Sequence, residues 1–328
     1  VTNSHETPPR HLRFGMEMRM NRLQANLSLL AITLLAGIQY AFLKDVPESA
    51  SGFSYLFITN LIGFLIALPV LGGQLYRSSP RQILYSALLA LLLLGFNLFM
   101  LLGSAGLDTT VTSFTVTAYI IFVPFISLLF KKKVSRNQMA GVLIVLLGLA
   151  LSMGVNGKGF LNIGILYLLV ADLCFAVSIV LLEEISAQMN PAVLVMGELF
   201  FGSLFSFVGW LVEDGFALVL PGDAAFWRSA FFVAFFIRGM YGIVQIYAQR
   251  YVGAIQVSLI FSTEIIFTLL LSPLLSILLG SQPEQIDLAK VLGCLVIVSG
   301  ILVADGTVWK SLREIGGKAV ARKKVRNE

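Results

Sequence analysis

The chain has 328 residues, of which 57% are hydrophobic and only 12% are charged. Soluble domains carry about 25% charged residues, so this chain has too few polar side chains to cover a surface in water. A helix needs about 20 apolar residues to cross the hydrocarbon core of a bilayer, which leaves room for roughly ten spans and no large domain outside the membrane. The composition therefore predicts an integral membrane protein and excludes a soluble one.

Ten apolar runs, separated by charged or turn-forming residues, predict an all-α fold with ten transmembrane helices. Pro69, Pro124 and Pro273 lie within runs and are expected to kink their helices. Asn190 and Pro191 are typical of a helix N-cap and the first helical residue. The ten runs are Leu27–Leu43, Phe53–Leu71, Ile83–Leu102, Thr109–Phe130, Gln138–Met153, Ile163–Leu182, Pro191–Val212, Phe226–Ala248, Ala254–Gly280 and Val291–Val308.

The basic residues indicate how these helices are oriented. They are concentrated in both terminal segments and in every second connection, for example in Lys131–Lys133, whereas the other connections carry few. Lysine and arginine are enriched on the cytoplasmic side of membrane proteins. We therefore expect a bacterial plasma-membrane protein with both termini in the cytoplasm, residues 1–24 forming a disordered tail and residues 309–328 a basic tail. Nucleic-acid binding is not expected, because the basic residues form no single folded surface.

The two halves of the chain resemble each other. Four ordered matches connect them, and the separation between matched residues grows along the chain, as expected for repeats whose loops have lengthened. Five spans are an odd number, so the second half must be inverted in the membrane relative to the first. The sequence predicts two inverted five-helix repeats, residues 25–155 and 156–308. The matches are Gly37–Leu43 with Ala176–Leu182, Gly63 with Gly202, Thr117–Phe122 with Ser262–Phe267, and Gly141 and Gly148 with Gly293 and Gly300.

Two five-helix halves, each ending in a span with this pair of glycines, resemble the drug/metabolite transporter superfamily and its EamA-like ten-helix branch. The segments 106–148 and 251–300 carry the resemblance. It implies secondary transport of small organic metabolites, with amino acids and related compounds a common substrate class and export the expected direction. The sequence departs from the family at Ala36, where tryptophan is frequent, at Ile265, where proline is frequent, and at Lys131-Lys132, where Gly-Glu is frequent.

Charged residues deep inside the predicted spans are the first candidates for a functional site. A charge at the centre of a bilayer costs roughly 2.5–3.5 kcal/mol on insertion scales, so each one requires a reason. Arg238, Tyr241 and Gln245 are spaced to share one face of an α-helix. That face predicts a polar wall of a central cavity, in which Arg238 binds a carboxylate or phosphate; an ion pair with a buried carboxylate is the alternative. The four deep charged residues are Asp172, Glu198, Arg238 and Glu264.

Further polar residues complete the predicted substrate site. Glu264 is assigned to it because the resemblance implies that its helix borders the cavity; the alternative is a carboxyl group bonded to a carbonyl freed near Pro273. Asn97 and Tyr119 are added as polar side chains within spans. Asp172 and Glu198 are expected to make hydrogen bonds between helices, with transfer of a coupling proton as a further hypothesis.

The favoured function is a secondary transporter that moves an amino acid-like, neutral, zwitterionic or cationic metabolite by alternating access. A carrier of organic phosphates or nucleotide sugars is an alternative, but such a carrier needs several basic groups in its cavity, and Arg238 is the only one deep in a span. A non-transporting membrane scaffold is another alternative, and it predicts buried polar groups that all satisfy one another.

An intramembrane enzyme is not expected. Both histidines, His5 and His11, lie in the terminal segment, and no HExxH, GxSxG or GxGD pattern is present. The sequence predicts no metal and no cofactor. The expected partners are a small-molecule substrate and the lipid bilayer, and the oligomeric state stays open.

Overall fold

The structure is a computed structural model that describes residues 20–43, 46–47, 50–105, 107, 109–152, 163–215, 220–279 and 286–305. Within these ranges the chain forms only helices and their connections, which confirms the all-α class. The predicted basic tail and residues 1–19 lie outside the described residues.

The first helix begins at Arg22, inside the segment predicted as a disordered tail. The reason is a reciprocal pair of hydrogen bonds that caps the helix. The backbone N–H of Asn21 donates to Oε1 of Gln24 at 2.9 Å, and the backbone N–H of Gln24 donates to Oδ1 of Asn21 at 2.8 Å. The predicted tail, residues 1–24, therefore overlaps the first helix by three residues, 22–24.

Within the described residues, eight segments are long and apolar enough to cross a membrane, and α6 and α13 are shorter apolar helices. η2 is a 3₁₀-helix and η3 is a π-helix. The elements are α1 Arg22–Leu43, α2 Gly52–Leu71, η2 Gly72–Arg77, α3 Pro80–Ser104, α4 Thr109–Val116, α5 Tyr119–Leu129, α6 Arg136–Ser152, α7 Ile163–Ser186, α8 Pro191–Glu213, α9 Ala224–Phe232, η3 Val233–Tyr241, α10 Gly242–Gln249, α11 Ala254–Phe261, α12 Glu264–Leu279 and α13 Leu288–Asp305.

Two of the predicted spans are interrupted near their middle. The fourth span breaks between α4 and α5 at Thr117 and Ala118, and the ninth breaks between α11 and α12 at Ser262 and Thr263. At the first break, Oγ1 of Thr117 donates to the Ser113 carbonyl oxygen at 2.7 Å. At the second, the hydroxyls of Ser262 and Thr263 donate to carbonyl oxygens three residues earlier, each at 2.7 Å. The Thr263 N–H bonds to the Ile260 carbonyl at 3.0 Å rather than to that of Leu259, so the Ser262 hydroxyl supplies the bond that the Leu259 carbonyl has lost.

The two interruptions are separate from the predicted proline kinks. Pro124 lies inside α5 and Pro273 inside α12, and both interruptions come before the prolines. Backbone bonds of the shorter i→i−3 type mark the breaks, such as Ala118 N–H to the Thr115 carbonyl at 2.9 Å. The local competition of serine and threonine side chains for backbone groups accounts for this location. By contrast, the predicted cap of α8 is confirmed, because Oδ1 of Asn190 accepts from the Ala192 N–H at 3.0 Å.

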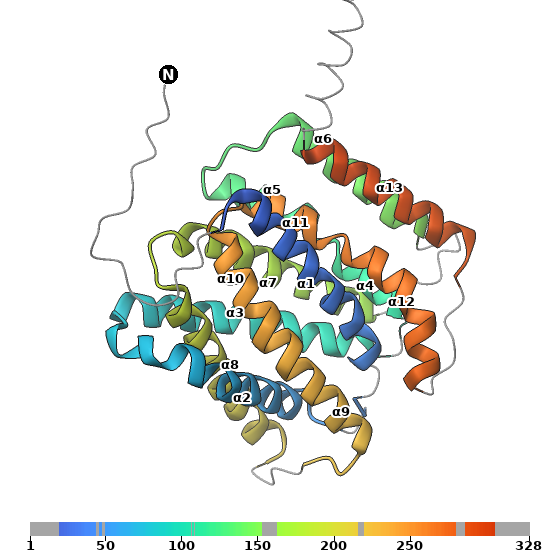
Figure 1. Cartoon of the computed structure of the whole chain (residues 1–328). Coiled ribbons are helices and arrows are strands. Elements are labelled where there is room, and N and C mark those ends of the chain that lie inside the picture. The colour runs from blue at the N-terminus through green and yellow to red at the C-terminus, as the bar shows by residue number, and fades with distance from the viewer. Residues whose placement is uncertain are drawn as a thin grey trace, which may run out of the picture.

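The helix pairs α2–α8 and α6–α13 lie at opposite edges of the bundle, as Figure 1 shows. The α6–α13 pair is held together by glycines. A Cβ atom added at Gly141 would lie 2.5 Å from the carbonyl oxygen of Gly300, and one at Gly148 would lie 2.8 Å from that of Gly293. Only glycine permits such close contact between backbones. Since the earlier glycine of each helix faces the later glycine of the other, α6 and α13 run antiparallel.

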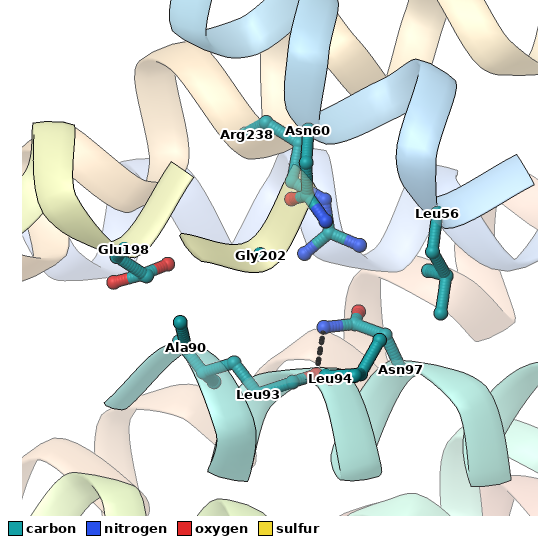
Figure 2. Close-up of a pocket in the computed structure, with 9 residues that line it drawn as sticks. All are labelled: Leu56, Asn60, Ala90, Leu93, Leu94, Asn97, Glu198, Gly202 and Arg238. Carbon is teal, nitrogen blue, oxygen red and sulfur yellow. Dashed lines mark hydrogen bonds between the residues drawn. The ribbon is translucent and has the colours of Figure 1, made fainter. Parts of the chain in front are cut away.

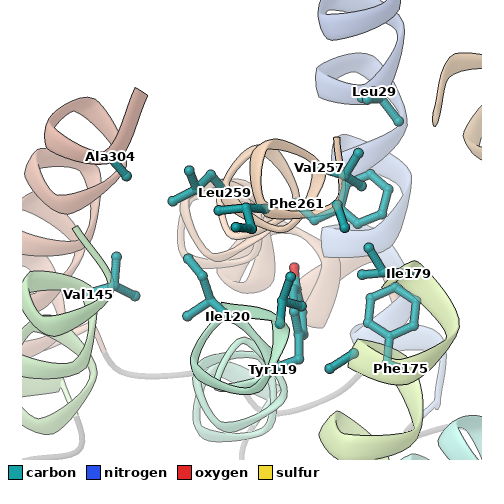
Figure 3. Packing of buried hydrophobic residues seen from close by; sticks show 14 of the residues in the cluster. Leu29, Tyr119, Ile120, Val145, Phe175, Ile179, Val257, Leu259, Phe261 and Ala304 are labelled. Atoms are coloured by element: carbon teal, nitrogen blue, oxygen red, sulfur yellow. The ribbon is translucent and has the colours of Figure 1, made fainter. Parts of the chain in front are cut away.

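A buried hydrophobic cluster joins α1, α5, α7 and α11 in the interior (Figure 3). Leu29, Ile120 and Ile179 are 0% exposed in it, and Phe261 is 1% exposed. Many large apolar side chains on the outside, such as Leu129 at 80%, are instead exposed. An apolar exterior is what contact with lipid requires, so this arrangement agrees with an integral membrane protein.

We predict that Gly141→Ala destabilises the protein, because its Cβ would also lie 2.4 Å from the Cβ of Ala304. Overpacking of this kind costs about 1–3 kcal/mol. Gly73→Ala is the matched control, since a Cβ at Gly73 meets no atom within 4 Å. Thermal unfolding of the purified protein in detergent measures both. Equal melting temperatures for the two variants would contradict the close contact between α6 and α13.

Candidate functional site

Buried polar side chains gather in two groups between the helices. The first, here called the amide–arginine cavity, contains Asn60 of α2, Asn97 of α3, Glu198 of α8 and Arg238 of η3. The second, the carboxyl–tyrosine cluster, contains Tyr40 of α1, Tyr119 of α5, Asp172 of α7, Tyr241 of η3 and Glu264 of α12.

The amide–arginine cavity is narrow, with room for about one water molecule. Figure 2 shows the guanidinium of Arg238 and the amides of Asn60 and Asn97 directed toward one another, with Glu198 at one end. Nδ2 of Asn97 donates to the carbonyl oxygen of Leu93 at 2.5 Å, and its amide oxygen is directed toward Arg238. The cavity therefore offers a positive charge and two amides in an otherwise apolar environment.

Two glycines at matching positions of the predicted repeats bring these side chains together. A Cβ added at Gly63 would lie 2.7 Å from the Cβ of Arg238, and one added at Gly202 would lie 3.1 Å from Nδ2 of Asn60. Close approach of the helices at these glycines positions the guanidinium and the amide side by side.

The predicted ion pair of Arg238 is not formed with any carboxylate in the described part of the chain. Lys132, by contrast, forms ion pairs with Glu183 at 2.5 Å and with Glu184 at 2.8 Å. Nε of Arg238 is buried and has no hydrogen-bond partner. Glu198 is the negative group that acts on Arg238 across the cavity. Arg238 thus keeps a hydrogen-bond donor that an intact structural ion pair would occupy.

In the carboxyl–tyrosine cluster, Glu264 begins α12 directly after the break in the ninth span. The hydroxyl of Tyr40 donates to its Oε1 at 3.2 Å, and Thr117 lies beside the same carboxyl group. Gly37 permits this contact, because a Cβ there would lie 3.1 Å from the backbone oxygen of Glu264. The partner predicted as the alternative, a carbonyl near Pro273, is not the one observed.

Asp172 is 0% exposed, and neither of its carboxyl oxygens has a hydrogen-bond partner. The predicted interhelical hydrogen bond of Asp172 is therefore wrong. The hydroxyl of Tyr119 is also buried and without a partner. Asp172 acts electrostatically on Glu264, Tyr40 and Tyr119, so the carboxyl groups and the tyrosines form one cluster.

The predicted polar face of the eighth span is divided. Arg238 lines the amide–arginine cavity, whereas Tyr241 contacts Phe261 with ring centroids 5.4 Å apart and acts on Glu264. Both residues lie in the π-helix η3, whose wider turns remove the α-helical alignment of residues three apart. Gln245 is buried in α10 and does not line the cavity.

Two residues of these groups, Asn60 and Tyr40, were not among the predicted site residues, and neither was Thr117, which lies beside Glu264. Asn60 is an amide within an apolar run, three residues before Gly63. Tyr40 and Thr117 lie in segments that repeat between the two halves. The repeated segments were the available signal, because they mark the spans that carry the carboxyl–tyrosine cluster.

Aromatic rings separate the two polar groups. Phe96, the neighbour of Asn97 in α3, stacks on Phe175 with ring centroids 4.5 Å apart. Tyr119 meets Phe175 edge-on at 5.0 Å, and Phe175 stacks on Phe261 at 6.3 Å. Figure 3 shows Tyr119, Phe175 and Phe261 together between α5, α7 and α11.

Comparison with known proteins connects this architecture with transport. The family model described as the EamA-like transporter family matches residues 23–154 and 162–304. An uncharacterized transporter of Archaeoglobus fulgidus is 25% identical over 261 residues, which cover 77% of this chain and 78% of that protein. A protein of known crystal structure has a similar fold, with a TM-score of 0.60 at 16% identity over 86% of this chain and 96% of the other.

We predict that Tyr40→Phe destabilises the protein, because it removes the hydroxyl that donates to the buried carboxyl of Glu264. Leaving a buried acceptor with one donor fewer costs about 1–3 kcal/mol. Tyr167→Phe, which removes a hydroxyl from α7 outside both polar groups, is the control. Thermal unfolding in detergent compares them, and a Tyr40→Phe melting temperature equal to that of the wild type would exclude this hydrogen bond as a stabilising contact.

Proposed function

The chain belongs to the EamA-like transporter family, and we propose that this membrane transporter is a secondary transporter that moves a small organic solute by alternating access. The proposed solute is amino acid-like and neutral, zwitterionic or cationic, and the proposed direction is export. The proposed location is a bacterial plasma membrane with both termini in the cytoplasm.

The ten-span topology is part of this proposal, with α6 and α13 as the fifth and tenth spans. Contacts between connections support it. Lys132 pairs with Glu183 and Glu184, and Nδ2 of Asn190 donates to Oε1 of Gln74 at 3.0 Å. Ten spans with cytoplasmic termini assign all of these residues to the cytoplasmic side. Ser51 and Glu213, which hydrogen-bond to each other, are assigned to the opposite side.

Inverted repeats are also part of the proposal, and the antiparallel α6–α13 pair supports them. In sequence, Gly141 matches Gly293 and Gly148 matches Gly300. In the structure, Gly141 lies against Gly300 and Gly148 lies against Gly293. A two-fold axis between the helices exchanges the contact of Gly141 with Gly300 for that of Gly148 with Gly293. The exchange of equivalent contacts is what an axis in the membrane plane produces.

The single observation that carries the proposal is the pair of helix breaks. Thr117 and Ala118 match Ser262 and Thr263 in the repeat, so both interruptions fall at equivalent positions. The breaks are followed directly by Tyr119 and Glu264, which belong to one cluster. In secondary transporters, interrupted helices at equivalent positions of two repeats form the substrate site near the middle of the membrane.

The two alternatives are less well supported. A carrier of organic phosphates needs several basic groups, whereas Arg238 is the one basic residue lining the amide–arginine cavity. A scaffold predicts buried polar groups that satisfy one another, whereas in the described part of the chain both carboxyl oxygens of Asp172 and Nε of Arg238 lack partners.

Transport into proteoliposomes tests the function. The panel contains amino acids, amines, sugars and organic phosphates, and we expect saturable flux of an amino acid-like or amine solute. A hydrogen bond to a charged group contributes about 1.5–3 kcal/mol, so Arg238→Gln should lower this flux about tenfold or more. Arg81→Gln, an exposed arginine at the start of α3, is the control. Flux of phosphates alone, or no flux of any solute, would contradict the proposal.

Labelling of single cysteines tests the orientation in a variant without the native Cys174 and Cys294. Lys133→Cys and Gly222→Cys lie at exposed positions of two connections. In intact cells, a membrane-impermeant maleimide should label the cysteine at position 222 and reach that at position 133 only after permeabilisation. The reverse pattern would contradict cytoplasmic termini, and labelling of both in intact cells would contradict the ten-span topology.

A further inference from the structure

The carboxyl–tyrosine cluster combines two acidic groups with no basic partner in the described part of the chain. The groups that act electrostatically on Asp172, Tyr40, Tyr119 and Tyr241 all belong to the cluster itself. The Glu264 carboxyl accepts a hydrogen bond from the hydroxyl of Tyr40, and Thr117, which is also uncharged, lies beside it. An environment of carboxyl groups and phenols favours a cation and disfavours an anion.

The cluster also contains polar atoms that need hydrogen-bond partners. Asp172 is 0% exposed with both carboxyl oxygens unpartnered, and Tyr119 is 1% exposed with its hydroxyl unpartnered. In Figure 3 the hydroxyl of Tyr119 points away from α5 toward Phe261. Leaving a buried polar group without a partner costs about 1–3 kcal/mol, and more for a charged group. An ionised carboxylate only accepts hydrogen bonds, so a ligand that satisfies both oxygens of Asp172 in that form must donate them.

Aromatic rings contact the tyrosines of the cluster. Tyr119 meets Phe175 edge-on at 5.0 Å, and Tyr241 lies against Phe261 at 5.4 Å. The faces of aromatic rings attract organic cations, and the attraction is strongest where water is excluded. The rings therefore supply the apolar part of a binding site whose polar part is acidic.

We propose that the carboxyl–tyrosine cluster binds the ammonium group of an organic amine. An ammonium group has three N–H donors and one positive charge, which suit the acceptors of Asp172 and Glu264 together. The inference rests on the proposed function in one respect, since it takes the bound amine to be part of the transported solute. It narrows the solute class to compounds with an ammonium group.

A divalent metal ion fits the cluster less well. In the described residues no three histidine, cysteine, aspartate or glutamate side chains gather to hold a metal ion. Calcium takes six to eight oxygen ligands, and magnesium retains several waters. The cluster supplies two carboxyl groups within a largely aromatic enclosure, which suits a cation that carries its own hydrogen atoms.

Equilibrium binding of radiolabelled methylammonium to the full chain in nanodiscs tests this proposal. Methylammonium is the smallest organic amine that carries the recognised group, and methanol is its neutral analogue. We expect saturable binding that unlabelled methylammonium displaces and that methanol and sodium chloride do not. Asp172→Asn and Glu264→Gln should each weaken binding at least tenfold. Glu184→Gln makes the same chemical change at an exposed carboxyl group and should leave the affinity unchanged.

Tyr119→Phe provides a second variant in case the carboxyl substitutions prevent folding, because it removes only the unpartnered hydroxyl. It should weaken methylammonium binding several-fold without changing the elution volume of the protein. The proposal is overturned if methylammonium does not bind saturably, if methanol or sodium displaces it equally well, or if neither the carboxyl variants nor Tyr119→Phe weaken it.

Binding is measured without a gradient, so it separates this proposal from the proposed function. Methylammonium binding without flux of any solute would contradict the proposed transport but not the ammonium site. Flux of neutral solutes without methylammonium binding would contradict the ammonium site alone.

Discussion

Inside a bilayer, every backbone N–H and C=O group must find a partner within the protein, because no water is present to replace one. This constraint decides where the chain can leave α-helical geometry. The fourth and ninth spans do so at Thr117 and at Ser262, where side-chain hydroxyls bond to carbonyl groups of the preceding turn. The breaks in turn allow Tyr119 and Glu264 to begin new helices inside the bundle. At the start of α12, the cluster thus depends on the Ser262 hydroxyl, which replaces the helical bond that the Leu259 carbonyl has lost.

Much of the fold is predictable from the sequence because hydrophobicity over about twenty residues reports directly on the bilayer. The predicted cap at Asn190 is also confirmed. A capping side chain bonds to the first turn of its own helix, so the local sequence is enough to indicate it. The breaks at Thr117 and Ser262 were not predicted. Serine and threonine hydroxyls can bond to a carbonyl of the preceding turn without ending a helix, so their presence alone does not mark a break.

The sequence predicted several of the site residues individually, but not how they are arranged relative to one another. Arg238, Asn97 and Glu198 were selected because polarity deep in a span is costly, and the structure brings these three together. Tyr241 was grouped with Arg238 on the assumption of α-helical spacing, which the π-helix removes. Tyr40 was not selected because a tyrosine within an apolar run is unremarkable until its hydroxyl is seen to donate to Glu264.

All four deep charged residues, Asp172, Glu198, Arg238 and Glu264, come from α7, α8, η3 and α12, in the second half of the chain. The sequence-matched positions of the first half carry neutral residues, for example Tyr119 opposite Glu264. An elementary charge that crosses the full membrane potential exchanges about 2.3 kcal/mol per 100 mV. Among these deep side chains, voltage therefore acts on those that are ionised, and all four lie in one half. Displacement of that half across the membrane would be electrogenic, whereas equal displacement of its counterpart would be electrically silent.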